Sequence, residues 1–595
     1  MDNQRNLILA IVLSAVLLFG FDFLMGKLYP QPETDGQPVA AAPLHDSAPA
    51  ASDAPPPTHV RDGGLTSPAD IEAERASLAL DLGAPERIRI EAPALTGSIN
   101  PVGARIDDLT LNEHKQTIDE DSGPVRLFSP DGTPAQHFAQ LGWVGEGVRL
   151  PHAATRWDAS GGPLTPGSPV TLSWDNGEGQ IFTITLSVDE NYMLTAEQAV
   201  RNNGAAPVVV QPYGFLNRTS RTASSDTWNV HSGPIGAFDG SVDFGNDYDD
   251  VIEAGTVAAG GRPDWIGFTD IYWMSALVPE SGSRPSGTFR SLGSEHFRAD
   301  LIYPPVTVAA GGNAVTTTRL FAGAKESEIL GAYDDSGITN FDLAIDWGWF
   351  SWFVQPILWL LVQLYRFAGN FGVAIVLLTV LVRLVMFPLA QKQFASMAAM
   401  RAIQPKMKAI QERYKDDKPK QQQEIMELYK REKVNPLAGC LPIFLQIPIF
   451  FALYKALMLS IEMRHKPFVL WLEDLSVPDP LHFLNLFGLL PFDVPSFLAI
   501  GPLALLLGLT MWLQFKLNPA AMDPIQQQMF MIMPWVLMFV MAPFPAGLLL
   551  YWNTSNLLTI AQQYYLYSKH PELKAQADKD RAEKAQQAER EKAKG

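Results

Sequence analysis

The sequence predicts a multi-domain membrane protein that combines an α-helical transmembrane bundle with a large β-sandwich domain in water. Long apolar runs are confined to residues 1–30 and 345–567. The stretch between them is acidic, since residues 26–340 carry 19 basic and 41 acidic side chains, a net charge of −22. Within that stretch, short alternating segments are separated by Gly, Pro, Asn and Asp, which is typical of a β-sandwich.

Composition argues against several classes of function. A chain of 595 residues needs more than one hydrophobic core, and its net charge of −18 argues against binding to nucleic acid. Its one cysteine, Cys440, cannot form an internal disulfide or a cysteine-based zinc site. The sequence has no phosphate-binding glycine loop, no His-Glu-x-x-His and no Gly-x-Ser-x-Gly motif. We therefore expect a protein that is not an enzyme and that uses no metal or other cofactor.

Residues 1–29 are predicted to form a transmembrane anchor, because the apolar run at 7–25 has about the length that a span needs. A cleaved signal peptide is the alternative, since small residues follow at 40–42. Residues 30–77 are predicted to be a disordered linker rich in proline and alanine. The β-sandwich domain then occupies 78–344. Both interpretations of the apolar run place this domain outside the cytoplasm.

A second membrane region follows the β-sandwich. Residues 345–368 contain four tryptophans and are predicted to form an amphipathic helix on the membrane surface. The span at 528–541 is short, which predicts a locally thin bilayer. A helical hairpin is predicted at 391–434 and a charged tail at 568–595. The five predicted spans of the core, which covers 369–567, lie at about 371–389, 436–457, 496–515, 528–541 and 546–566.

The distribution of charge predicts the orientation of the chain. The hairpin holds 11 basic and six acidic residues, so the positive-inside rule places it in the cytoplasm. With the β-sandwich outside, the chain has six spans and both termini in the cytoplasm, provided that 345–368 does not cross the membrane. The loop 460–495, with two basic and five acidic residues, is then external.

Arg383 stands out because it lies near the middle of a predicted span. It is three residues past the centre of 371–389, where a charge costs about 2.5–3.5 kcal/mol on insertion scales. The five predicted spans of the core contain no Asp or Glu that could pair with it. Two alternatives remain. The side chain extends to the cytoplasmic surface, or it lies in a water-filled cavity where it can meet an acidic group.

Polar side chains on four of the predicted spans favour the cavity. One such side chain alone is typical of an interhelical hydrogen bond. Several of them together with an unpaired arginine predict one hydrophilic groove inside the bundle. They are Thr379, Gln446, Thr510 and Gln514, together with a stripe at helical spacing formed by Trp552, Asn556, Thr559 and Gln563.

Three segments of the core carry a resemblance to a known family. They are 380–389 (VLVRLVMFPL), 433–440 (KVNPLAGC) and 551–557 (YWNTSNL). These segments resemble the YidC/Oxa/Alb family of membrane protein insertases, and the resemblance covers roughly 345–567. Residues 78–341 resemble the Gram-negative form of the family more loosely, chiefly in the run GSINPVGA at 97–104.

The resemblance implies an insertase and chaperone of the bacterial inner membrane that works alone or with the Sec translocon. It implies a groove that is open to cytoplasm and lipid and holds Arg383, with Thr379 nearby and with Tyr551 and Trp552 in contact with the substrate. Residues 30–344 are then periplasmic. The implied partners are nascent membrane proteins, the Sec translocon with its accessory subunits, the lipid bilayer and, weakly through the hairpin and the tail, the ribosome.

Two other functions remain open at this point. Arg383 would also suit a secondary transporter for a small anionic solute, although the sequence shows no convincing internal repeat. The β-sandwich domain would suit a carbohydrate-binding module or enzyme, but it shows no clear pair of catalytic carboxylates.

Overall fold

The computed structural model describes residues 64–569 apart from 120, 225–229, 294, 349–350, 416, 433–440, 488, 491–493, 495–497 and 518–523. The predicted anchor 1–29 lies outside the described residues. So do most of the predicted linker 30–77 and nearly all of the predicted tail 568–595.

The first described element is a helix in a region that the sequence predicts to be disordered. Helix α2 spans Pro68–Asp81, so the predicted linker ends too late. The Ser67 side chain accepts a hydrogen bond from the Asp70 amide and Pro68 occupies the first turn, and both features favour the start of a helix. Ala, Glu and Leu then recur along the segment, and these residues have high helix propensity.

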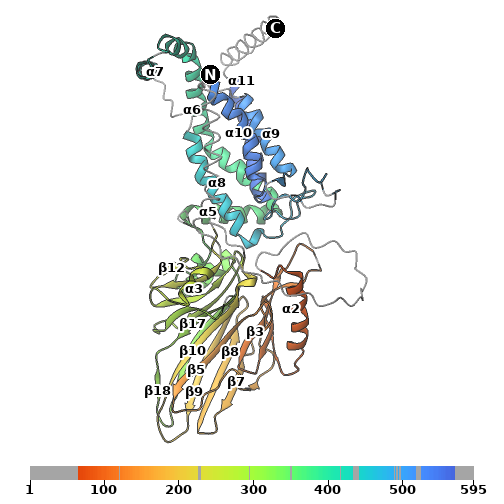
Figure 1. The fold of residues 1–595 in the computed structure, drawn as a ribbon, viewed down its shortest axis with the longest axis vertical. Coiled ribbons are helices and arrows are strands. Elements are labelled where there is room, and N and C mark those ends of the chain that lie inside the picture. Colours follow the sequence, from red (N-terminus) through yellow and green to blue (C-terminus); the bar gives the residue numbers. More distant parts are fainter. Residues whose placement is uncertain are drawn as a thin grey trace, which may run out of the picture. The chain divides into compact units, whose positions relative to one another are not determined.

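Two antiparallel sheets form a β-rich domain, as the sequence predicts (Figure 1). The larger sheet has the order β1-β2-β3-β5-β10-β17-β16-β13, with β4 beside β3 and β18 beside β10. The second has the order β12-β11-β14-β15-β19-β9-β8-β7-β6. The strands of the first sheet are β1 (Ile88–Glu91), β2 (Leu95–Asn100), β3 (Arg105–Lys115), β4 (Pro124–Phe128), β5 (His137–Glu146), β10 (Val208–Thr219), β13 (Thr256–Ala258), β16 (Ser286–Ser291), β17 (His296–Ile302) and β18 (Val306–Val308). Those of the second are β6 (Asp158–Ser160), β7 (Val170–Asp175), β8 (Gln180–Val188), β9 (Met193–Asn202), β11 (Gly233–Phe238), β12 (Ser241–Asp243), β14 (Pro263–Thr269), β15 (Trp273–Pro279) and β19 (Asn313–Ala324).

Alternation along the strands builds one core shared by both sheets. In β8, Phe182, Ile184 and Leu186 are buried, whereas the residues between them are only partly buried. A period of two places every second side chain on the same face of a sheet. These side chains belong to the same continuous cluster as Leu216 of the first sheet and Trp265 of the second.

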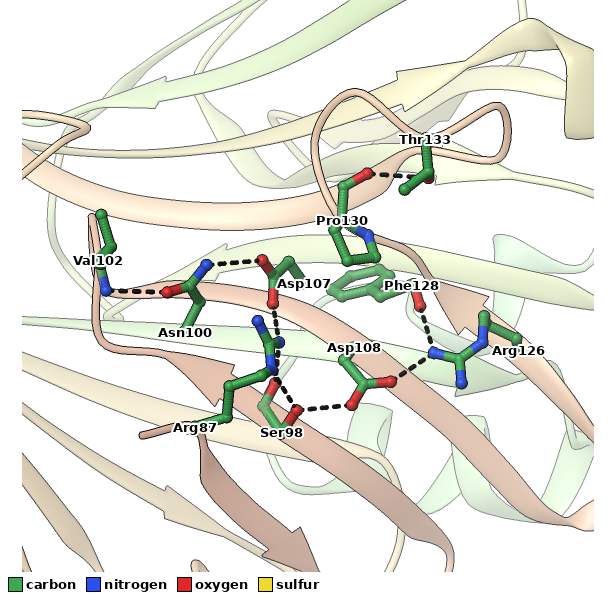
Figure 2. Close-up of polar contacts among 10 residues, drawn as sticks. All are labelled: Arg87, Ser98, Asn100, Val102, Asp107, Asp108, Arg126, Phe128, Pro130 and Thr133. Atoms are coloured by element: carbon green, nitrogen blue, oxygen red, sulfur yellow. Dashed lines mark hydrogen bonds and ion pairs between the residues drawn. The ribbon is translucent and has the colours of Figure 1, made fainter. Parts of the chain in front are cut away.

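A bulge in β3 carries a network of buried charges (Figure 2). The register between β2 and β3 shifts next to Ser98, which makes Asp107 an extra residue in β3. Asp107 accepts a hydrogen bond from Arg87, and Asp108 accepts hydrogen bonds from Ser98 and from Arg126. Each buried carboxylate thus has its own arginine, as a buried charge requires. The network therefore holds the edge of the first sheet together.

Helix α5 occupies most of the segment 345–368, for which an amphipathic helix is predicted. It spans Ser351–Ala368 and buries Val354 and Leu358. Its other face exposes Trp352, Trp359 and Phe367, which are 69%, 63% and 85% accessible. Its placement on the membrane surface stays a prediction. The remaining short elements outside the apolar helices are η1 (Ser220–Thr222), α3 (Tyr248–Ala254), α4 (Ser327–Asp335), η2 (Asp342–Ala344) and η4 (Ile461–Met463).

The apolar C-terminal region is helical, with bounds that differ in part from the predicted spans. Helix α6 runs without a break from the span predicted at 371–389 into the predicted hairpin, whose second arm is α7. Helix α10 has 18 residues and begins four residues before the span predicted at 528–541, and its apolar stretch is Met531–Met541. A short span at this place stays a prediction. The helices are α6 (Phe371–Arg413), α7 (Lys418–Arg431), α8 (Leu441–Leu459), α9 (Pro502–Leu517), α10 (Pro524–Met541) and α11 (Ala546–Lys569).

A second hydrophobic cluster, distinct from that of the β-rich domain, packs these helices together. Helix α11 packs against both α6 and α9, and α10 packs against α9 (Figure 1). Within the described part of the chain, one stretch, Phe371–Gln391, is long and apolar enough to span a membrane. Three shorter apolar stretches are Gln446–Leu459, Pro502–Lys516 and Met531–Met541.

Candidate functional site

Arg383 lies on α6 beside α11. Asn370 caps the start of α6 by accepting a hydrogen bond from the Val373 amide at 3.0 Å. Arg383 follows the first residue of the helix by 12 positions and therefore lies about 18 Å along its axis. Its Nε donates to Ser555 Oγ on α11 at 3.1 Å, and its Nη2 donates to the same oxygen. Among the residues that the structure describes, no carboxylate pairs with Arg383. Its partner is a neutral hydroxyl, so its positive charge is not compensated.

A cavity of about 270 Å³ extends from Arg383 between α6 and α11. Most of its lining residues follow Arg383 or Ser555 in their helices, so the cavity lies toward the C-terminal ends of both helices. Its rim is open, because Leu384 is 63% exposed and Tyr565 is 50% exposed. The cavity is lined by Val380, Arg383, Leu384, Phe387, Leu558, Ala561, Gln562 and Tyr565.

The outer surface beside this cavity is apolar. Leu384, which lines the cavity from α6, is 63% exposed, and Leu557, which precedes the lining residue Leu558 on α11, is 52% exposed. Apolar surface exposed on this scale marks contact with a membrane or with an apolar partner. The site therefore combines an uncompensated guanidinium with an adjoining apolar wall.

A second set of contacts joins α8 to α11 one helical turn before Ser555. The Gln446 amide donates to the Tyr551 hydroxyl at 2.5 Å, and Tyr551 is 1% exposed. The ring of Trp552 packs against Phe450 with 4.9 Å between their centres. In this structure Tyr551 and Gln446 thus satisfy each other inside the bundle.

A third set of contacts joins α9 to α11. The Asn556 amide donates to Thr510 Oγ1 at 3.1 Å, and Thr510 donates to Asn553 Oδ1 at 3.4 Å. Asn553 also donates to the backbone oxygen of Leu503 at 2.9 Å. All three polar side chains are buried, and none of them lines the cavity beside Arg383.

The two remaining predicted residues lie elsewhere. Thr379 is completely buried and donates to the backbone oxygen of Ile375 in its own helix at 2.6 Å. Gln514 is half-buried on α9, one turn after Thr510. Of the residues proposed from the sequence, Arg383 is therefore the one that lines the cavity. Substrate contact by the others stays a prediction.

Of the residues on this face of α11, the resemblance named Tyr551, but sequence reasoning missed Ser555, Leu558 and Gln562. The predicted stripe begins at Trp552, whereas the contacts to Gln446 and Arg383 and the cavity wall are made by Tyr551, Ser555, Leu558 and Gln562. These positions have the same helical spacing but start one residue earlier, which rotates the face by about 100°. Hydropathy could not distinguish the two faces, because Tyr551 and Ser555 are no more polar than Trp552 and Asn556.

The site is suited to binding. Among the described residues, no cluster of three or more His, Cys, Asp or Glu side chains could hold a metal ion. The chemistry on offer is attraction of an anionic group by a partly buried guanidinium, next to a surface that an apolar segment can follow.

Two family models match the chain. The model described as "60Kd inner membrane protein" matches residues 363–574, and the one described as "YidC periplasmic domain" matches 87–360. A protein of Zymomonas mobilis named membrane protein insertase YidC is 43% identical over 575 residues, which cover 96% of each chain. Its namesake from Bradyrhizobium diazoefficiens is 42% identical and covers 96% of this chain and 97% of its own. A crystal structure described as an active YidC insertase covers 81% of this chain and 93% of its own, with 18% identity and a TM-score of 0.34.

Proposed function

This chain belongs to the YidC family of membrane protein insertases, and from that premise we propose that the groove at Arg383 receives the polar flank of a client protein. Membership of this family makes it an inner-membrane protein that inserts other proteins and is not an enzyme. Membership of this family also argues against the alternative predicted from the sequence, a transporter for a small anionic solute.

The observation that carries the proposal is the neutral partner of Arg383. A hydroxyl can accept hydrogen bonds from a guanidinium but cannot neutralise its charge. An acidic or phosphate-like group that enters the cavity would form a charge-assisted pair with Arg383, which is stronger than the bond to Ser555. The groove thus favours a client whose translocated flank carries Asp or Glu.

The apolar wall gives the hydrophobic part of the client a path into the lipid. Leu384 on α6 and Tyr565 on α11 line the cavity and are exposed, and Leu557 precedes the lining residue Leu558 and is exposed as well. A client helix that follows this wall leaves water as its flank occupies the groove. Its burial in lipid supplies about 0.8 kcal/mol for each CH₂ group, so the protein itself needs no nucleotide.

The proposal includes the orientation and the partners predicted from the sequence. In this orientation the chain has six spans, both termini and the hairpin 391–434 lie in the cytoplasm, and residues 30–344 lie in the periplasm. The C-terminal ends of the cavity-lining parts of α6 and α11 then lie on the cytoplasmic side, and so does that end of the cavity. Nascent chains reach it there from the ribosome or from the Sec translocon. The excess of basic residues in the hairpin supports a weak contact with the ribosome.

Insertion into proteoliposomes tests the role of the charge. Single-span clients with an acidic flank and with the matching Asn/Gln flank are compared on the parent chain, Arg383→Ala and Arg383→Lys. We expect Arg383→Ala to lower insertion of the acidic client at least several-fold while the neutral client changes little. Arg383→Lys keeps the charge and should retain most of the activity.

Ser555→Ala is the matched control, because it removes the neutral partner and leaves the guanidinium in place. This variant should insert the acidic client at least as well as the parent chain. Equal loss of both clients on Arg383→Ala would assign Arg383 a structural role and overturn the proposal. Unchanged insertion by both Arg383 variants, in protein that remains folded, would do the same.

A further inference from the structure

The loop between α8 and α9 is attached to the start of α9 through the buried side chain of Asp479, which we call the root of the loop. Asp479 is 2% exposed and accepts hydrogen bonds from Trp471 Nε1 at 3.0 Å, from the Leu481 amide at 3.2 Å and from the Leu503 amide at 3.0 Å. It thus ties the loop to the first turn of α9. Gly501 permits this approach, because a Cβ atom there would lie 2.5 Å from the Asp479 carboxyl carbon.

The segment after this root exposes an unusual amount of apolar surface. Residues 481–490 read LHFLNLFGLL and contain no Asp, Glu, Lys or Arg. The exposed fractions are 56% for Phe483, 50% for Leu486, 48% for Phe487 and 81% for Leu489. A solvated loop is normally polar, and an apolar patch of this kind marks an interaction surface.

Two residues of this segment have strained backbone conformations. Leu486 and Phe487 have φ angles of 50° and 60°, in the left-handed region that disfavours residues with a Cβ atom. The turn is closed by bonds from the Phe487 amide to the His482 oxygen at 2.8 Å and from the Leu490 amide to the Asn485 oxygen at 3.0 Å. Strain of this kind persists where the surroundings compensate for it.

We propose that residues 481–487 and 489–490 form a membrane wedge that dips into the boundary between headgroups and acyl chains beside α9. Lipid is the occupant that fits, because α9, to which Asp479 ties the loop through the Leu503 amide, also exposes apolar side chains: Leu505 is 46% exposed and Leu509 is 51% exposed. The wedge needs no counter-charge because it carries none. Interfacial segments bury their apolar side chains a short way below the headgroups, with aromatic residues such as Trp471 at the same level.

Depth-dependent quenching on the full-length chain tests the wedge. Cys440→Ser removes the one native thiol, and an environment-sensitive fluorophore is then attached at Leu489→Cys in vesicles of phosphatidylethanolamine and phosphatidylglycerol. The matched control is Leu80→Cys on α2 of the β-rich domain, because Leu80 is 80% exposed. We expect lipids with a nitroxide near the headgroup to quench the Leu489 probe at least three-fold more than the Leu80 probe. Aqueous iodide should show the reverse order.

Two results would overturn the wedge. One is equal exposure of both probes to iodide with no quenching by lipid. The other is quenching or shielding that appears only at high protein density, which would assign the surface to a second copy of the chain. Leu486→Asp with the probe at Leu489 should cut the lipid quenching toward the Leu80 value, in protein whose thermal unfolding is unchanged. The measurement reports depth whether or not Arg383 receives clients, so the two proposals can fail separately.

Discussion

Asn553 illustrates how a single side chain ties two membrane helices together. It is 3% exposed, and its amide donates to the backbone oxygens of Leu503 on α9 and of Leu549 on α11, each at 2.9 Å. Such interhelical bonds contribute about 0.6 kcal/mol on average. Arg383 differs in kind, because its partner Ser555 accepts hydrogen bonds from Nε and Nη2 but does not compensate the charge. A polar group that is fully satisfied holds the bundle together, whereas Arg383 remains available to an incoming anion.

Lys325, which follows β19, predicts a pH dependence of stability. It is 2% exposed, and its ammonium donates to the neutral hydroxyl of Thr269 at 3.0 Å. Burial lowers the pKa of Lys325 to about 8, although Asp270 and Asp346 act in the opposite direction. Between pH 8 and about 10.5 the unfolded chain holds a proton that the folded chain has released, so stability rises with pH in this window. Below pH 8 the folded chain carries the full cost of the buried charge.

Lys325→Met removes this cost and is therefore expected to raise stability at pH 7. The gain is up to about 3 kcal/mol, at about 1.4 kcal/mol for each unit of pKa difference, and it should shrink at pH 9.5. Thermal unfolding of the detergent-solubilised chain at the two pH values, followed by tryptophan fluorescence, measures the difference. Lys415→Met changes an exposed lysine and should have little effect at either pH. A gain from Lys325→Met that is the same at both pH values would contradict the assignment.

At the scale of elements, the pairing of β2 with β3 depends on close contact between backbones. A Cβ atom at Gly97 would lie 1.9 Å from the backbone oxygen of Asp108, which belongs to the partner strand. The contact lies beside the bulge that directs Asp107 and Asp108 to their arginines (Figure 2). Strand spacing and charge pairing therefore support each other at this edge of the sheet.

Gly97→Ala is accordingly expected to destabilise the β-rich domain by about 1–3 kcal/mol, the usual cost of overpacking. Hydrogen–deuterium exchange of the β2 and β3 amides should rise, and that of α9 and α11 should not change. Gly167→Ala is the control, because a Cβ atom there meets no neighbour within 4 Å. Exchange that is equal in the two variants would show that β3 moves aside without cost.

At the scale of the whole molecule, the partition into a β-rich domain and an apolar helical core could be predicted because it depends on patterns that extend over many residues. The alternation of buried and partly buried residues in β8 and the apolar composition of the first part of α6 each extend over many residues, so a single exceptional residue does not hide them. The limits of α2 and α10 depend on a cap and on glutamines that hydropathy does not register. In the site, the position of Arg383 could be predicted from its charge. Its partner Ser555 could not, because one residue of offset on α11 changes the face and leaves the spacing unchanged.

The last prediction concerns the orientation of the chain in the membrane. It depends on how many times the chain crosses the membrane between the β-rich domain and the α6–α7 hairpin. Between the β-rich domain and the α6–α7 hairpin lie two apolar helices, α5 and the first half of α6. If α5 lies flat, the chain crosses once, and Ser281→Cys and Gln422→Cys in a Cys440→Ser background face opposite sides of the membrane. The charge difference between the two regions predicts that an impermeant maleimide labels Ser281→Cys in spheroplasts and Gln422→Cys in inverted vesicles. Glu473→Cys, in the loop between α8 and α9, should label with Ser281→Cys. Labelling of both Ser281→Cys and Gln422→Cys in spheroplasts would show that α5 crosses the membrane and that the cavity at Arg383 faces the periplasm.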